Sequence, residues 1–312
     1  MTHLPSDHPI TSTGRRTAFT LAEMLVVLLI LSALAFVAVE ALRPVASQAR
    51  FEATQRTLEN VRRAIVGEAA DSAPNAAVRG FVADMGRFPE TLAELVQVPA
   101  DQAPANAADS SFGLRPGPGV YHSIMTPAGW RGPYVLAPPG ASSPLVALRD
   151  GWGTPLAPAP PLPLTPDAAG AIAISSPVTN ERIDAAPEYA VELSAVIRPE
   201  DWRPTLIAGT LFRLDGTMRA PPSGVGVWRI AVLGPGRLSG PGADPNGVKV
   251  IEVLATAAPT GEVSYSILGE STPELTAGPR VIVATLDGVL QGRPLYVPLR
   301  GGGTHVIDLQ VE

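Results

Sequence analysis

The stretch that decides the fold is FTLAEMLVVLLILSALAFVAV, residues Phe19 to Val39, which contains a single charged side chain, Glu23. At about 1.5 Å of rise per residue, a helix of this length spans roughly 30 Å, the thickness of the hydrocarbon core of a bilayer. A secretory signal peptide has a shorter apolar core followed by a small-residue cleavage site. The sequence therefore predicts a transmembrane helix over residues 19–39.

The flanks of this helix predict its orientation. Arg15 and Arg16 lie just before it, and basic residues beside a membrane helix favour the cytoplasmic side. We therefore expect a single-pass protein of a bacterial inner membrane, with a cytoplasmic N-terminus and periplasmic C-terminal domains. Burying the Glu23 carboxylate costs about 2.5–3.5 kcal/mol on insertion scales. Either this carboxylate is hydrated near the interface, or it has a partner.

A basic tail, a small residue, Phe19-Thr20-Leu21-Ala22-Glu23 and an apolar helix follow one another in this chain. This order resembles the class III signal of type IV pilins and type II secretion pseudopilins. The resemblance implies that a prepilin peptidase cuts between Ala18 and Phe19 and methylates the new N-terminus. It also implies that Glu23 pairs with the N-terminal amine of a neighbouring subunit during assembly. The family usually has glycine where this chain has Ala18.

Three further motifs resemble pseudopilin segments and occur in the family's order: DMGRFPETLAELV at 84–96, GWRGPYV at 129–135 and RDGWGTPL at 149–156. Large aromatic side chains beside Gly/Pro turns bury much area next to tight backbone bends. We therefore expect Trp130, Tyr134 and Trp152 to be structural anchors. The implied partners are other pilin or pseudopilin subunits, prepilin peptidase, the inner-membrane assembly platform and the membrane itself.

The rest of the chain predicts an α+β fold. Leu58, Val61 and Ile65 have helical spacing, which extends the first helix to about residue 70, with a kink at Pro44. From about residue 187, about eight short runs rich in β-branched residues alternate with turn residues, as in a β-sandwich of the immunoglobulin or transthyretin-like class. The expected architecture is a long pilin helix packed on a small β-sheet, followed by this sandwich.

These patterns give five expected segments: a leader over 1–18, the pilin helix over 19–72, a pseudopilin-like globular domain over 73–157, a Pro/Ala-rich linker over 158–186 and the β-sandwich over 187–312. The linker has few apolar residues that could join its two neighbours. We therefore expect the sandwich to fold independently.

Composition argues against several functions. The net charge of −6 in 312 residues argues against nucleic-acid binding, which requires a surface of clustered basic residues. The absence of cysteine excludes disulfides and thiol catalysis. After loss of the leader, His122 and His305 are the remaining histidines, too few for a histidine-based metal site or triad. No nucleophile motif or acid/base pair is evident, so we do not expect an enzyme.

The sequence does not decide whether the chain binds calcium. Major secretion pseudopilins follow the Trp-Gly-x-Pro element with an acidic, glycine-rich calcium loop, whereas this chain has APAPPLPLTPDAAG. We therefore expect no cofactor, with Asp150, Asp167 and Asp184 as the oxygen donors to examine if calcium binds.

The sequence thus predicts a structural subunit of a type II secretion pseudopilus or a type IV pilus-like fibre. The alternative is a minor or tip pilin, or a membrane-anchored binding protein, whose β-domain recognises a substrate or partner.

Overall fold

The computed structural model describes residues 20–67, 79–99, 113–136, 148–158, 164–185, 187–223, 225–237, 243–272 and 274–311. The chain divides into two units, residues 1–48 and 49–312. Helix α1 (Leu21–Val66) has residues in both units, and the other elements all belong to the second. One long apolar helix together with several antiparallel sheets confirms the mixed α+β class.

The apolar part of α1, in the first unit, is exposed. Every side chain from Thr20 to Ala46 is exposed. Among the described residues, α1 is the one helix long and apolar enough to cross a membrane, judged by length and composition. The helix continues through Pro44, although proline has no N–H to donate to the carbonyl four residues earlier.

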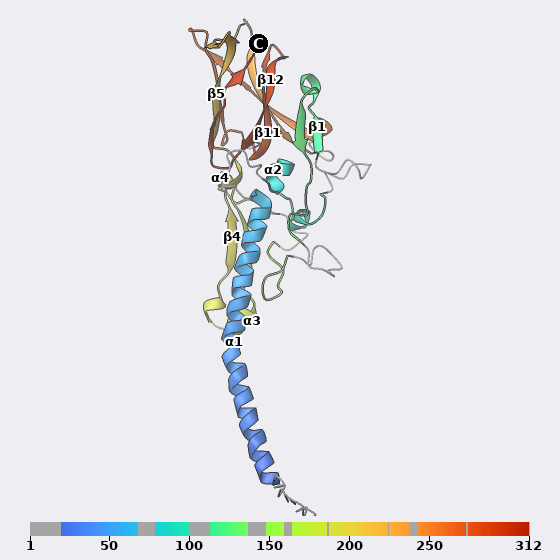
Figure 1. The fold of residues 1–312 in the computed structure, drawn as a ribbon, viewed down its shortest axis with the longest axis vertical. Coiled ribbons are helices and arrows are strands. Elements are labelled where there is room, and N and C mark those ends of the chain that lie inside the picture. The colour runs from blue at the N-terminus through green and yellow to red at the C-terminus, as the bar shows by residue number, and fades with distance from the viewer. Residues whose placement is uncertain are drawn as a thin grey trace, which may run out of the picture. The chain divides into compact units, whose positions relative to one another are not determined.

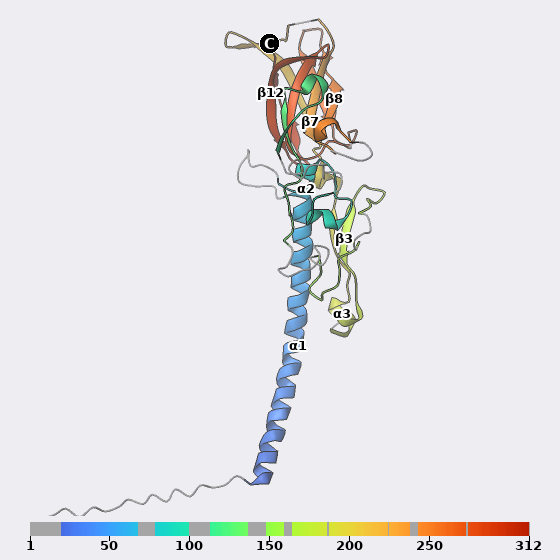
Figure 2. The same ribbon diagram turned by 90° about the vertical axis from the view of Figure 1, so that its right-hand side faces the viewer.

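The part of α1 in the second unit is a core helix. Leu58, Val61 and Ile65 are buried, as their spacing predicts. They share an apolar cluster with side chains of β3 (Ile172–Ser176) and β4 (Leu193–Ile197), which pair antiparallel as a two-stranded sheet. A helix packed on a small sheet is therefore present, and Figure 2 shows β3 beside α1.

Short elements surround this core: α2 (Phe81–Met85), η1 (Leu92–Leu95), β1 (Gly113–Pro116), η4 (Gly119–Tyr121), β2 (Met125–Ala128), α3 (Asn180–Ala185), η6 (Pro187–Tyr189) and α4 (Pro199–Trp202). Strands β1 and β2 form an antiparallel hairpin. Helix α2 lies beside the end of β11, as Figure 1 shows.

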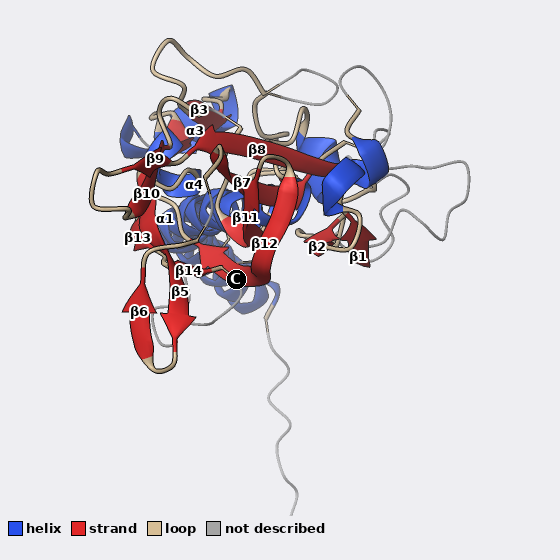
Figure 3. Ribbon diagram, turned by 90° about the horizontal axis from the view of Figure 1, so that it is seen from above, coloured by secondary structure: helices blue, strands red, loops and turns tan. Residues whose placement is uncertain are grey.

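The remaining strands form two further sheets. One has the order β13-β5-β10-β9 and comprises β5 (Leu206–Asp215), β9 (Thr256–Ala257), β10 (Val263–Leu268) and β13 (Thr304–Val306), with β6 (Met218–Ala220) and β14 (Leu309–Gln310) also paired to β5. The other has the order β12-β11-β7-β8 and comprises β7 (Trp228–Pro235), β8 (Val248–Leu254), β11 (Gly278–Leu286) and β12 (Val289–Leu299). Strands β13 and β14 run parallel to β5, and the β5–β6 hairpin projects from its sheet in Figure 3.

These two sheets share one apolar core. Ile207 and Tyr265 from the first sheet and Ile230 and Ile282 from the second belong to the same buried cluster. Strand β10 alternates buried and exposed residues, the pattern of a strand with one covered face. Strand β7 does not alternate, and all its residues are buried except Arg229.

A third cluster explains why β7 is buried on both faces. Tyr121 and Ile124, from η4 and the loop before β2, pack against Ala231, Leu233 and Val281. The outer face of the β7–β11 sheet is therefore covered by residues from the middle of the chain. A strand covered on both sides has a continuous apolar sequence instead of an alternating one.

The structure differs from the expected segments at one boundary. Residues 158–186, expected to be a linker, contain β3 and α3, and β4 pairs with β3 although it was assigned to the sandwich. A division at residue 187 would separate these paired strands. The reason is that Ile172 and Ile174 alternate with smaller residues and enter the core beside α1, within a stretch whose composition is dominated by Ala and Pro.

The cover on β7 and β11 leads to a prediction about truncation. A fragment of residues 187–312 loses Tyr121 and Ile124 and exposes the apolar residues beneath them. We expect it to bind an apolar dye and to self-associate in sedimentation, because a contiguous apolar patch is left in water. Residues 49–312, the intact unit, are the control. A monomeric 187–312 fragment with the same melting midpoint as the control would contradict the prediction.

Candidate functional site

The first turn of α1 holds its only acidic residue within the apolar stretch. The Thr20 N–H and Thr20 Oγ1 donate to Glu23 Oε2 at 2.9 and 3.0 Å, and the Glu23 N–H donates to Thr20 Oγ1 at 3.2 Å. This reciprocal pattern is a capping box, in which two backbone N–H groups without helical partners are satisfied by side chains. The Thr-x-x-Glu spacing was visible in the sequence, but sequence reasoning did not use it.

The capping box gives Glu23 a local role beside any role in assembly. Its charge lies at the helix N-terminus, where the helix dipole favours an anion. None of the three hydrogen bonds uses Oε1, so the carboxylate keeps acceptor capacity for a cation. The arrangement is compatible with both a hydrated and a partnered carboxylate. Ala18 and Phe19, where the sequence predicts cleavage and methylation, lie outside the described residues.

Two of the expected aromatic anchors join the first two motifs of the globular unit. The Trp130 indole donates to the Glu94 carbonyl at 3.0 Å. Its ring meets that of Tyr134 edge to face, with centroids 6.0 Å apart. The Tyr134 hydroxyl donates to Asp84 Oδ2 at 3.0 Å and accepts from the Arg131 N–H at 3.1 Å. Segments 84–96 and 129–135 are therefore in direct contact with each other.

Trp152 lies in a different place, against α1. Its ring is 6.4 Å from that of Phe51 and 6.3 Å from that of Tyr189. The neighbouring Gly151 donates its N–H to Thr54 Oγ1 at 2.9 Å, and a Cβ at Gly151 would lie 2.0 Å from the Arg50 carbonyl oxygen. The third motif therefore forms a tight turn that is hydrogen-bonded to α1. Glycine is needed at position 151 because the backbones of the turn and the helix are in contact.

Asp84 is fully buried at the junction of α2 with β11. Its Oδ1 lies 3.1 Å from Arg131 Nη2. Burial raises the pKa of Asp84 from 3.8 to about 6, while Arg131, the Tyr134 hydroxyl, Arg280 and Arg79 act in the opposite direction. The fold therefore accommodates a carboxyl group whose charged form is destabilised.

Arg280 of β11 is the second buried ionisable group at this junction. It donates to the carbonyl oxygens of Ala83 at 3.1 Å, Pro279 at 2.8 Å and Ala277 at 2.7 Å, and also to the Thr276 hydroxyl. Burial lowers the pKa of Arg280 to about 9, and Asp84 opposes this shift. Nothing in the sequence around Arg280 distinguished it from an ordinary strand arginine.

The junction also requires two glycines. Gly86 has φ of 67°, and a Cβ there would lie 2.1 Å from the Pro235 carbonyl oxygen. Gly278 has φ of 126°, and a Cβ there would lie 2.7 Å from the Ala83 Cα. Both positions combine a left-handed backbone with close packing, so α2 can contact the ends of β7 and β11 directly.

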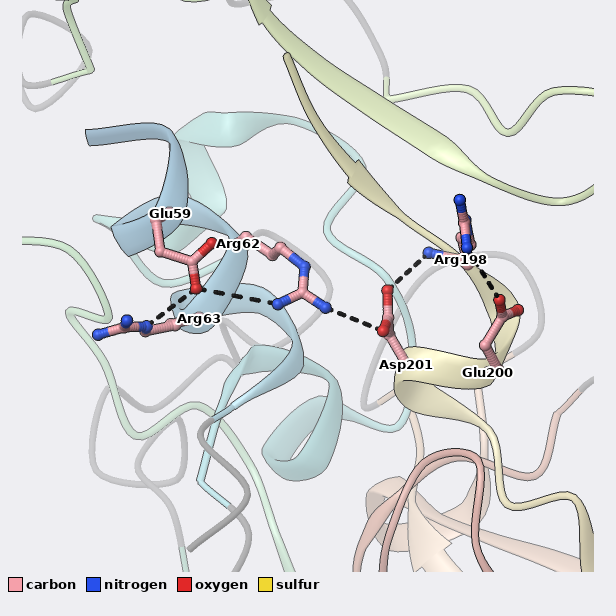
Figure 4. A network of polar contacts seen from close by, with 6 residues as sticks. All are labelled: Glu59, Arg62, Arg63, Arg198, Glu200 and Asp201. Atoms are coloured by element: carbon pink, nitrogen blue, oxygen red, sulfur yellow. Dashed lines mark hydrogen bonds and ion pairs between the residues drawn. The ribbon is translucent and has the colours of Figure 1, made fainter. Parts of the chain in front are cut away.

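A polar network joins α1 to α4, which precedes β5 (Figure 4). Arg62 Nη2 lies 2.9 Å from Asp201 Oδ1, and Glu59 Oε1 lies 3.0 Å from Arg63 Nε. Asp201 Oδ2 also accepts from the Arg198 N–H at 2.9 Å. Because the Arg62–Asp201 pair is only partly exposed, it helps to fix the helix against α4, which leads into β5.

Of the three carboxylates named for calcium, the structure describes the side chains of Asp150 and Asp167. Asp150 accepts from the Trp152 and Thr154 N–H groups and from the Ser176 hydroxyl, at 2.9, 2.7 and 2.6 Å. Asp167 accepts from the N–H groups of its own turn, and the Asp184 side chain lies outside the description. The part of the chain that the structure describes contains no group of three or more potential metal-ligating His, Cys, Asp or Glu residues. The expectation of no cofactor, with calcium left open, stays a prediction from the sequence.

The described residues define a class of protein: they contain one apolar helix of membrane-spanning length, together with an α+β globular unit. No protein-family model matches the chain, and no curated protein matches it.

The burial of Asp84 leads to a prediction about pH. A carboxyl group whose pKa is higher in the folded than in the unfolded state binds a proton more tightly when folded. Its stabilising contribution is present below pH about 4 and is lost as the pH rises through about 6, by up to roughly 3 kcal/mol. We expect Asp84→Asn to flatten the pH dependence of the unfolding free energy between pH 4 and 7, measured by urea titration of the full chain in detergent.

Asp215→Asn is the control for this experiment, because Asp215 is exposed. It should retain the wild-type pH dependence. An Asp84→Asn variant whose stability falls with pH as steeply as the wild type would contradict the assignment.

Proposed function

We propose that this protein is a structural subunit of a type II secretion pseudopilus or a type IV pilus-like fibre, assembled through its apolar N-terminal helix. The observation that carries the proposal is the division of α1. Residues 20–46 are exposed and predominantly apolar, while residues near its end are buried in the core. A helix that is apolar on all sides requires lipid or other helices around it. Neighbouring copies of the same helix supply such an environment in a fibre.

Glu23 gives this assembly a specific contact. Inside a bundle of apolar helices the dielectric constant is low, so an unpaired amine is costly and a matched carboxylate is selected. The capping box holds Oε2 and presents a carboxylate that keeps one oxygen for the amine of a neighbouring subunit. In this proposal prepilin peptidase exposes the amine, and the inner-membrane assembly platform moves the subunit out of the membrane.

The proposed location is the inner membrane, with the N-terminus in the cytoplasm and residues 49–312 in the periplasm. Arg15 and Arg16 support this orientation. Within the exported part, we propose that the two sheets with a common core form a sandwich of the immunoglobulin or transthyretin-like class. The apolar core that the two sheets share supports this proposal.

A minor or tip subunit is the second candidate. Several large apolar side chains are exposed on the β5–β6 hairpin, before β7, at the end of β8 and after β11: Leu214, Met218, Val225, Val227, Leu254 and Val289. Exposed apolar side chains in the strand-rich part of the chain are available to contact a partner. Counting the copies per fibre by quantitative mass spectrometry separates the two candidates.

The first test of the proposal is processing of the N-terminus. In cells that contain a prepilin peptidase, we expect the mature chain to begin at Phe19, shortened by residues 1–18 and carrying an N-methyl group. Intact mass and N-terminal sequencing provide the measurement. Ala18→Gly, which restores the family's usual residue, should be cut at the same bond at least as completely. A mature chain that still begins at Met1, or one that is cut after Val39, would contradict the pilin assignment.

The second test separates the two roles of Glu23. Glu23→Gln keeps an acceptor for the capping box, because Gln also serves at this position, but removes the charge. Thr20→Val removes the cap and keeps the charge, at about 1 kcal/mol of helix stability. We expect Glu23→Gln to insert normally and lose most crosslinked ladders of assembled subunits, while Thr20→Val retains them. Wild-type ladders from Glu23→Gln would show that Glu23 is needed only as a helix cap.

A further inference from the structure

A buried arginine lies inside a cage of oxygen atoms in the segment between β3 and β4. Arg182 of α3 is 0 % exposed. Its Nη1 donates to the Ser176 carbonyl at 3.1 Å, the Ser176 hydroxyl at 3.0 Å and the Pro177 carbonyl at 3.1 Å. Its Nε donates to the Tyr189 carbonyl at 3.1 Å, and its Nη2 donates to the Val191 carbonyl. One guanidinium therefore gathers four backbone carbonyls and one hydroxyl.

The surroundings of this cage also favour a cation. The Trp152 ring lies 4.8 Å from the Arg182 guanidinium carbon, and its face attracts positive charge. The Ser176 hydroxyl that accepts from Arg182 donates in turn to Asp150 Oδ2 at 2.6 Å. Desolvation lowers the pKa of Arg182, and the negative charges of Asp150 and Glu192 oppose that shift. Asp150 therefore helps to balance the buried charge through the Ser176 hydroxyl.

Apart from Tyr189, whose ring lies near those of Phe51 and Trp152, the described side chains of residues 176–191 bury little apolar area. Val178, Ile183 and Val191 are exposed large apolar residues, so their burial contributes little. Converging carbonyl oxygens repel one another unless a cation lies between them, which is how proteins bind calcium and potassium ions. The guanidinium of Arg182 supplies that cation here, and the two N–H groups of Nη1 are shared among three of the five oxygens.

We propose that residues 176–191 form a cation-binding cage whose ligand is the chain's own guanidinium, so that this segment is ordered without a free metal ion. The cage selects a planar cation with several N–H donors, and removal of the Arg182 side chain leaves a site for free guanidinium. This inference concerns the conformation of the globular unit and does not rest on the proposed role in fibre assembly.

The test uses hydrogen–deuterium exchange of the full chain in detergent, followed by mass spectrometry of peptides from residues 176–191. We expect Arg182→Ala to speed exchange in these peptides at least about tenfold, while peptides of β10 stay at wild-type rates. Guanidinium chloride at about 10 mM, far below denaturing concentrations, should restore most of the protection. Urea at the same concentration has a similar planar shape without the charge and should restore none.

Controls keep the proposal open to refutation. Arg56→Ala removes an arginine side chain that is 76% exposed and should leave the segment unchanged. If Arg182→Ala does not fold, Arg182→Lys provides a second test, because lysine keeps the charge but not the planar fork, and intermediate protection is expected. In the wild type, calcium and EDTA should give the same exchange rates in this segment.

Three outcomes would overturn the proposal. They are equal rescue by urea and guanidinium, wild-type protection in Arg182→Ala, and a calcium-dependent change in the wild type. None of these outcomes bears on subunit assembly, so they leave the proposed function to its own tests.

Discussion

The globular unit depends on the burial of the last turns of α1. Leu58, Val61 and Ile65 enter one apolar cluster together with the β3–β4 sheet and the short elements that follow the helix. The same helix begins with residues that are exposed, Leu21 to Ala46. Because helical hydrogen bonds are local, one continuous helix can meet two different environments without a break. Any motion that withdrew the buried turns would expose the core of the second unit.

Buried polar groups join the remaining parts of the second unit. Asp84 and Arg280 connect α2 to β11, and Arg182 holds the segment between β3 and β4. Such groups are costly to desolvate, so they contribute less to net stability than their hydrogen bonds suggest. Their value is geometric, because each leaves few alternative arrangements for the backbone carbonyls around it. The two-sided cover of β7 adds an apolar constraint to the same junction.

Local patterns predicted what depends on neighbours in sequence. The apolar run and the spacing of Leu58, Val61 and Ile65 both reappear in the structure. The capping box was equally local and could have been found from Thr20 and Glu23. The β3–β4 pair was missed because Ile172 and Ile174 lie in an Ala/Pro-rich stretch, and composition outweighed a short alternation.

By itself, the sequence determined the long apolar helix, the mixed α+β class and the strand-rich C-terminal half, since periodicity and turn residues record which faces must be buried. Only the tertiary structure decided that Tyr121 and Ile124 cover the outer face of β7 and that Arg280 meets the Ala83 carbonyl. It also decided that the carbonyls of Tyr189 and Val191 meet Arg182. These contacts depend on backbone atoms and distant segments, and neither leaves a periodic signal in the residues that make them.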